Sequence, residues 1–202
     1  MLPENYFIYI QLIIFYFITP GPPRVVIVSN TINYGLRKSV WTAFGDISAN
    51  FVQASLVTFV IGSLLIDNPD VYVYLKWAGI IYLLYLAYET LTLKIKKADI
   101  KNKVFRSNLA MYRDGFLVAG LSPKALVFFG TIFLTFINFE KNVISQFLIL
   151  ISTWMTLDFF SLMIYGLAAR KIALWLKGNP RTLNTISACV LIIIALYVAI
   201  KT

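Results

Sequence analysis

The chain has 202 residues, of which 59% are hydrophobic and 13% are charged, and its mean hydropathy is +0.78. Soluble domains carry roughly 45–50% apolar and about 25% charged residues, so a water-soluble fold cannot bury this much apolar surface. The single cysteine, Cys189, excludes an internal disulfide, and the absence of histidine argues against a zinc site or histidine-based catalysis. The composition therefore predicts an all-α integral membrane protein without a metal or other cofactor.

The apolar runs predict six transmembrane helices in a single transmembrane domain. Their expected ranges are 5–33, 40–66, 71–93, 115–137, 143–169 and 183–200. The first run follows no basic segment and no small-residue cleavage site, so we expect a retained helix rather than a signal peptide. It is also too long for one uninterrupted crossing and contains Thr19-Pro20-Gly21-Pro22-Pro23. Helix breaks at membrane depth are tolerated where the freed backbone faces protein or a wet cavity, so this break indicates a binding site.

The formal net charge of +9 is explained by membrane topology rather than by a nucleic-acid partner. Lys and Arg gather in alternate loops, at 37–38, 94–113 and 170–181, whereas the other loops and both ends are relatively acidic. Cytoplasmic loops retain positive charge, so we expect both termini on the non-cytoplasmic side of the cell inner membrane. The basic loop at 94–114 separates two three-helix halves, 1–93 and 115–202. An odd number of helices per half inverts the second half, which predicts a 3+3 inverted repeat.

Each half contains one proline-linked cation and one carboxylate inside its predicted helices. Arg24 follows the broken segment Pro20, Gly21 and Pro22, and Asp46 lies early in the next helix. In the second half, Pro123-Lys124 interrupts the fourth helix, and Asp158 lies in the fifth. Charged groups at a helix centre cost about 2.5–3.5 kcal/mol each, so they usually face the bundle interior and pair.

These groups have two interpretations, which the sequence leaves open. Arg24 and Lys124, together with helix N-terminal amides, could hold a substrate carboxylate. Asp46 and Asp158 could then meet an ammonium group or carry a coupling proton, which suits an amino-acid zwitterion. Alternatively, Arg24 with Asp46 and Lys124 with Asp158 could be structural ion pairs, or some of these side chains could extend to the membrane interface.

Aromatic and glycine residues are expected to serve packing. Trp77, Trp154 and Trp175 suit an aromatic belt and the bundle interior, and we assign them no chemistry. Several glycines within the apolar runs more often permit close helix approach than bind a ligand: Gly62, Gly79, Gly115, Gly120 and Gly166.

Three segments carry recognisable motifs. They are Thr19-Pro20-Gly21-Pro22 followed by Gly45-Asp46, Ser122-Pro123-Lys124-Ala125, and the stretch from Asp158 that ends in Gly166-Leu167-Ala168-Ala169-Arg170. In this combination the chain resembles the LysE/RhtB family of amino-acid exporters (LysE-type translocators) over nearly its whole length. The second segment looks like the Asn-Pro-Lys-Ala motif that begins the fourth helix of that family.

The resemblance implies a six-helix inner-membrane protein that exports amino acids or related small zwitterionic metabolites. It also implies coupling to the proton gradient and an arrangement compatible with a homodimer. The proline segments themselves predict broken first and fourth helices, and we expect transport by alternating access. The chain departs from the family pattern at Pro23 and Ser122, where asparagine is usual, and at Leu134-Thr135, where Pro-Gln is common.

Two other classes of function remain open at this stage. An intramembrane enzyme acting on lipid-type substrates would need paired carboxylates for magnesium or a Ser/His set, and the carboxylates here are isolated on different helices. A structural subunit of a membrane complex would not need broken helices with internal charge. We therefore expect a transporter and not an enzyme, with a small-molecule substrate and the lipid bilayer as its surroundings.

Overall fold

The computed structural model describes residues 3–18, 21–62, 69–92, 106–169 and 171, and a few residues between 185 and 200. Within these ranges every regular element is a helix, as the composition predicts. The loop at 94–105 and most of the predicted sixth helix, 183–200, lie outside the described residues. The count of six helices and the internal repeat therefore stay predictions.

The first predicted helix is broken as expected. Helix α1 spans Tyr6–Ile18 and helix α2 spans Pro22–Tyr34, and their axes meet at 55°. Proline stands at the first two positions of α2, where the missing N–H groups would have no helical partner in any case. Gly35 then ends the helix at φ 85°, a left-handed conformation that glycine adopts without strain.

Helix α3 spans Leu36–Leu56 and continues as a π-helical turn, η1, over Val57–Ile61. It begins at residue 36 rather than at residue 40 as predicted, because the helix resumes directly after the glycine turn. Helix α5, at Pro69–Thr92, follows closely the predicted range of 71–93.

The second half begins with another broken helix. Helix α6 spans Asn108–Gly120 and helix α7 spans Pro123–Val127, and the two segments of this span meet at 54°. The chain continues through a π-helical turn, η2 (Phe128–Ile132), and a 3-10 turn, η3 (Phe133–Phe136). Helix α8 then spans Val143–Leu167.

The range predicted for the fourth helix, 115–137, was therefore wrong at its start. Helix α6 begins at Asn108, inside the segment predicted as a basic loop. The Ser107 hydroxyl accepts a hydrogen bond from the Ala110 N–H, an ordinary N-cap, and Arg106 pairs with Asp114 across the first turns. The cap and this polar pair begin the helix before its apolar stretch.

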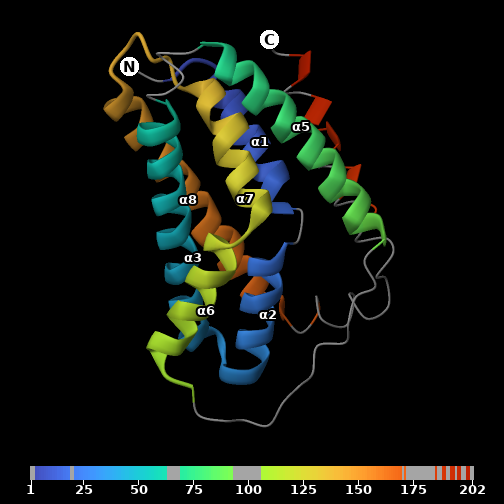
Figure 1. Ribbon diagram of the computed structural model, residues 1–202. Helices are drawn as coiled ribbons and strands as arrows, with labels where there is room; N and C mark the ends of the chain where they lie inside the picture. Colours follow the sequence, from blue (N-terminus) through green and yellow to red (C-terminus); the bar gives the residue numbers. More distant parts are fainter. Residues whose placement is uncertain are drawn as a thin grey trace.

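The helices run between two ends of the bundle, and the bent spans run in opposite directions (Figure 1). From α1 to α2 the chain descends in this view, and from α6 to α7 it ascends. The start of α3, which contains Arg37, and the start of α6 lie at the lower end, whereas the start of α1 and the loop before α8, which contains Glu140, lie at the upper end. The orientation of the two ends relative to the membrane stays a prediction.

The outer surface is apolar, as a lipid-facing surface requires. Phe7, Ile81, Phe160 and Ile164 all expose more than half of their surface. A soluble monomer rarely exposes so much contiguous apolar area. By length and hydropathy, two described helices can cross a membrane, Leu36–Ile61 and Val143–Leu167, and each bent pair can supply one more crossing.

Two different kinds of packing hold the bundle together. Around the upper half of α8, buried aromatic rings from α1, η2, η3 and α8 form one cluster, which we call the aromatic cluster: Tyr9, Tyr16, Phe17, Phe128, Phe129, Phe133, Phe136 and Trp154.

In the lower half, α3 and α6 meet backbone to backbone. A Cβ at Gly45 would collide with the Tyr112 carbonyl, and one at Gly115 would collide with the Thr42 carbonyl. The expected role of Gly115 in close helix approach is confirmed, and Gly45 shares that role.

Candidate functional site

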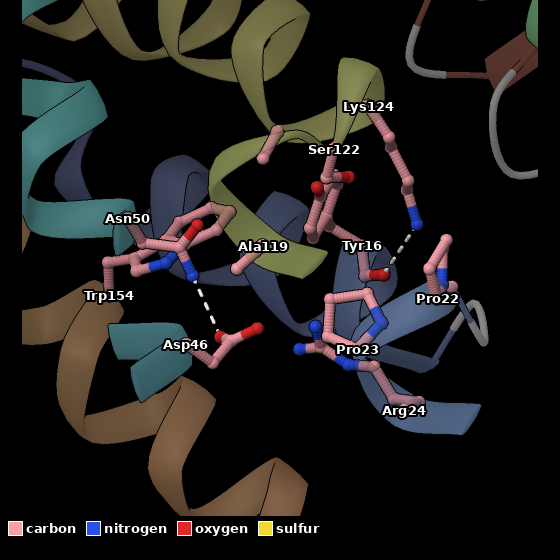
Figure 2. A pocket seen from close by; sticks show the side chains of 12 residues that line it. Tyr16, Pro22, Pro23, Arg24, Asp46, Asn50, Ala119, Ser122, Lys124 and Trp154 are labelled. Carbon is pink, nitrogen blue, oxygen red and sulfur yellow. Dashed lines mark hydrogen bonds between the residues drawn. The ribbon is translucent and has the colours of Figure 1, made fainter. Parts of the chain in front are cut away.

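The two helix breaks come together near the middle of the bundle and enclose a pocket (Figure 2). Its lining residues come from both breaks and from α3 and α8: Tyr16, Gly21, Pro22, Pro23, Arg24, Asp46, Asn50, Ala119, Ser122, Lys124, Ala125 and Trp154. The space between them, including its opening, is about 320 Å³, but it is so narrow that its middle admits about one water molecule. The structure therefore shows the pocket in a nearly closed form.

An ion pair joins the two halves at this pocket. The Arg24 guanidinium, in the first turn of α2, donates to the Asp158 carboxylate of α8, and both side chains are buried. The arginine also lies over the Phe17 ring, 4.8 Å from its centroid. Separating a buried ion pair leaves each charge without compensation, which is strongly unfavourable. This pair therefore holds α2 against α8.

One amide group serves both carboxylates of the site. The Asn50 Nδ2 group donates to Asp46 at 2.9 Å and to Asp158 at 3.0 Å. Asp46 and Asn50 lie one turn apart on the buried face of α3, and Asp46 points into the pocket (Figure 2). Asp158 is compensated by a guanidinium as well as by this amide, whereas the Oδ1 atom of Asp46 has no hydrogen-bond partner in the described residues.

Side chains from the second half satisfy the backbone at the first break. Lys124, at the start of α7, donates from Nζ to the Tyr16 carbonyl at 3.3 Å and lies 4.0 Å from the Tyr16 ring centroid. The Tyr165 hydroxyl donates to the Ile18 carbonyl at 2.8 Å. The last carbonyls of a helix carry partial negative charge and have no helical partner, so a lysine is well placed there.

A side chain from the first half satisfies the second break. Gln53 of α3 donates from Nε2 to the Gly120 carbonyl at 2.8 Å and to the Ala119 carbonyl at 3.4 Å. These are the last carbonyls of α6. Each break is thus held by side chains that the other half supplies.

The backbone amides at the breaks offer little to an anion, contrary to expectation. Pro22 and Pro23 have no N–H, and the next two amides of α2 already donate to the Gly21 carbonyl at 3.0 and 3.2 Å. At α7, Ala125 and Leu126 similarly donate to the Ser122 carbonyl. These four amides are therefore not available to an anion, and the pocket's cationic and indole side chains are better placed to bind one.

Several pocket side chains keep a buried polar atom without a hydrogen-bond partner in the described part of the chain: Arg24 Nε, Asp46 Oδ1 and Trp154 Nε1. Buried polar atoms in native proteins are nearly always paired with protein, water or a ligand. The two nitrogens can only donate and the ionised carboxylate oxygen can only accept. The pocket therefore contains both buried donors and a buried acceptor that lack hydrogen-bond partners among the described residues.

The structure brings most of the predicted site residues together. Gly21, Pro22, Arg24, Asp46 and Lys124 line the pocket, and Asp158 contacts Arg24 beside it.

Two proline predictions have a different outcome. Pro20 lies outside the described residues. Pro123 forms the first residue of α7, and its placement in the break follows from the helix bounds alone.

The alternative pairing of Arg24 with Asp46 was wrong, and that of Lys124 with Asp158 stays a prediction. Arg24 pairs with Asp158 of the other half rather than with Asp46, because the bend at each break turns its cation toward the opposite half. The expectation that the carboxylates are isolated was also wrong, since Asn50 contacts both. Within the described residues no group of three acidic, histidine or cysteine side chains could hold a metal.

Sequence reasoning missed Asn50, Gln53 and Trp154. A signal for the first two was present, because Ser39, Thr42, Asp46, Asn50 and Gln53 repeat at spacings of three and four residues within an apolar helix. Such spacing marks one helix face, and polar residues in a membrane helix usually face the bundle interior. Trp154 was assigned to packing, and no feature of the sequence distinguishes it from the other tryptophans.

The sequence comparisons agree with this geometry. The profile of the LysE type translocator family matches residues 14–202. The chain belongs to the LysE type translocator family. Membership makes it a membrane translocator with a small-molecule substrate.

Two of the similar proteins are named for the efflux of homoserine and homoserine lactone. The chain is 26% identical to the homoserine/homoserine lactone efflux protein of Salmonella typhimurium (strain LT2) over 171 residues, which is 84% of this chain and 82% of the relative. The protein of the same name in Salmonella typhi is 25% identical with the same coverage. An uncharacterized membrane protein of Vibrio cholerae is 25% identical over 84% of this chain and 83% of the relative. No solved structure matches the chain.

Proposed function

We propose that this protein is a secondary transporter that exports amino acids or related small zwitterionic metabolites from the cytoplasm, coupled to protons and working by alternating access. The observation that carries the proposal is the pocket at the meeting point of the two breaks, where two cations and two carboxylates converge. Relatives named for homoserine efflux support an amino-acid substrate.

The charges of the pocket suit a zwitterion. Arg24 and Lys124 contribute two positive charges, and Asp46 and Asp158 contribute two negative charges, so the ionised site is balanced before anything binds. A solute with a net charge would disturb that balance inside the membrane, whereas an amino acid with a carboxylate and an ammonium group preserves it. The unpartnered donors and the unpartnered acceptor match the two ends of such a solute.

Asp46 is the residue we assign to coupling. Its neighbour Asp158 is committed to Arg24, but Asp46 Oδ1 has no partner among the described residues. An acid that takes either a proton or the solute's ammonium group binds them in turn, which couples outward solute movement to inward proton movement. Asp158 then serves mainly to hold Arg24 at the pocket.

The packing on either side of the pocket favours alternating access. Toward the end where α1 begins, the aromatic cluster closes the interior. Toward the other end, α3 and α6 are in direct backbone contact at Gly45 and Gly115. A pocket that admits about one water molecule must open to load a solute, and the helix breaks are natural places for that movement. The positive loops orient the second end toward the cytoplasm.

Efflux from loaded proteoliposomes tests the proposal. Vesicles containing L-homoserine and a mixture of other amino acids should release one or more of them when a proton gradient is imposed. Asp46→Asn should abolish gradient-driven release while the protein remains folded and inserted, because the amide cannot exchange a proton. Asp114→Asn is the matched control, since that carboxylate pairs with Arg106 away from the pocket.

The outcomes are distinct. Release that requires Asp46 and tolerates Asp114→Asn supports the proposal and names the substrate. Release that persists in Asp46→Asn would remove proton coupling at this residue. A folded wild-type protein that releases no amino acid under any gradient would contradict the proposed substrate class. A homodimer remains a prediction, which light scattering of the purified protein would measure.

A further inference from the structure

Trp154 lies at the boundary between the pocket and the aromatic cluster. Only 1% of its surface is exposed, and its ring packs against those of Tyr16, Phe17, Phe128 and Phe129, with centroid separations between 4.6 and 5.2 Å. This packing holds the indole in one orientation. Trp154 also lines the pocket, in which Figure 2 shows it beside Asn50.

The indole nitrogen of Trp154 lacks the hydrogen bond that it could donate. Nε1 is buried and has no hydrogen-bond partner in the described part of the chain. Indole N–H can only donate, and a buried tryptophan usually finds an acceptor. A phenylalanine at this position would have supplied the ring packing without an unsatisfied donor, so packing alone does not explain the N–H.

The surroundings indicate which acceptor it would meet. Trp154 and Asp158 lie one turn apart on the buried face of α8, and Arg24 is bonded to Asp158. Arg24 Nε is a second buried donor without a partner among the described residues. Two fixed donors at one pocket favour a group with several acceptor oxygens, whereas Asp46 Oδ1 favours a donor group.

We propose that Trp154 is a substrate-contacting residue whose indole N–H, together with Arg24, binds the carboxylate of the transported amino acid. The assignment rests on the proposed function and deepens it, because it orients the solute. The carboxylate lies toward α8 and the ammonium group toward Asp46 on α3. The indole sets specificity for solutes with a carboxylate over analogues that lack one.

Trp154→Phe tests the assignment, because phenylalanine retains an aromatic ring and removes the N–H. Binding of L-homoserine and of L-homoserinol, which has a hydroxymethyl group in place of the carboxylate, is measured on purified protein. A hydrogen bond to a charged group typically accounts for roughly ten- to hundred-fold in affinity. We expect that loss for L-homoserine and almost no change for L-homoserinol, together with a raised KM and little change in maximal efflux.

Two further variants separate the N–H from the shape of the ring. Incorporation of 3-benzothienylalanine at position 154 keeps the bicyclic ring and replaces N–H by sulfur, so it should reproduce the loss seen with Trp154→Phe. Trp41→Phe changes a tryptophan that is 43% exposed and should leave both affinities unchanged. Tryptophan fluorescence should respond to L-homoserine in the wild type and lose that response in Trp154→Phe.

Each result has one meaning. Wild-type affinity for L-homoserine in the benzothienyl variant would overturn the role of the N–H and leave the proposed function intact. Equal losses for L-homoserine and L-homoserinol would also overturn it, because a change in pocket shape would then be responsible. If the wild type binds and exports neither L-homoserine nor any standard amino acid, the proposed function fails, and this assignment fails with it.

Discussion

The two helix breaks have similar backbones but different charge environments. At the first, Arg24 follows two prolines and forms an ion pair with Asp158. At the second, Lys124 follows one proline and donates to a backbone carbonyl at the end of α1. One cation is thus neutralised by a carboxylate, and the other is placed at the negative end of a helix dipole.

This difference indicates that the two breaks have different functions. A buried ion pair is rigid and expensive to separate, so the first break suits a fixed part of the binding site. The bond from Lys124 to the Tyr16 carbonyl has an uncharged acceptor and costs less to separate than a buried ion pair, so the second break suits a moving part. The predictions below test this division, beginning with the largest expected effect.

Arg24→Gln should cause the largest loss of stability, about 3–5 kcal/mol, because it leaves Asp158 buried without a partner. Thermal melting in detergent, followed by size-exclusion chromatography, measures the change. The double variant Arg24→Gln with Asp158→Asn removes both charges and should recover much of the melting temperature. If the single and double variants melt alike, the pair is not what holds α2 to α8.

Lys124→Met should abolish efflux but destabilise the protein less, by about 1–3 kcal/mol, because the aliphatic stem stays and only the polar contacts are lost. Melting and gradient-driven efflux are measured on the same preparation. Lys141→Met is the control, since that lysine forms an exposed pair with Glu4 and such pairs contribute about 0–1 kcal/mol. A Lys124→Met protein as unstable as Arg24→Gln would contradict the division between the breaks.

Gln53→Leu should have the smallest effect, with a stability loss of about 1 kcal/mol and slower efflux rather than none. Leucine has a similar volume but leaves the Ala119 and Gly120 carbonyls of α6 without their donor. The comparison variant is Ser55→Ala on the exposed face of α3, whose hydroxyl bonds to its own helix. Identical melting temperatures and rates in the two variants would show that Gln53 does not hold the second break.

Much of the fold could be predicted from the sequence, because the bilayer imposes simple rules on length and charge. The apolar runs predict the ranges of α5 and α8 closely, and the proline segments predict both breaks. The early start of α6 could not be predicted from hydropathy, since Arg113 and Asp114 separate its first turn from the apolar stretch and only the Ser107 cap marks the boundary.

The charged residues of the site could be predicted from the sequence, but which cation pairs with which carboxylate could not. Ionisable groups inside apolar runs must face the interior, which identifies Arg24, Asp46, Lys124 and Asp158. Which cation meets which acid depends on the bend at each break, and no local pattern contains that angle. Trp154 was missed for a related reason, because its role depends on a donor atom that lacks a partner only in the folded arrangement.

Protection of a cysteine within the pocket tests the central claim, that the solute binds where the breaks meet. In a Cys189→Ser background, Ser122→Cys places one thiol at the pocket, and Ser107→Cys places one at the exposed start of α6. The rate of labelling by a membrane-permeant maleimide is measured with and without L-homoserine, or another amino acid that the protein exports. We predict slower labelling of Ser122→Cys alone. Equal rates at a concentration that saturates efflux would contradict the claim.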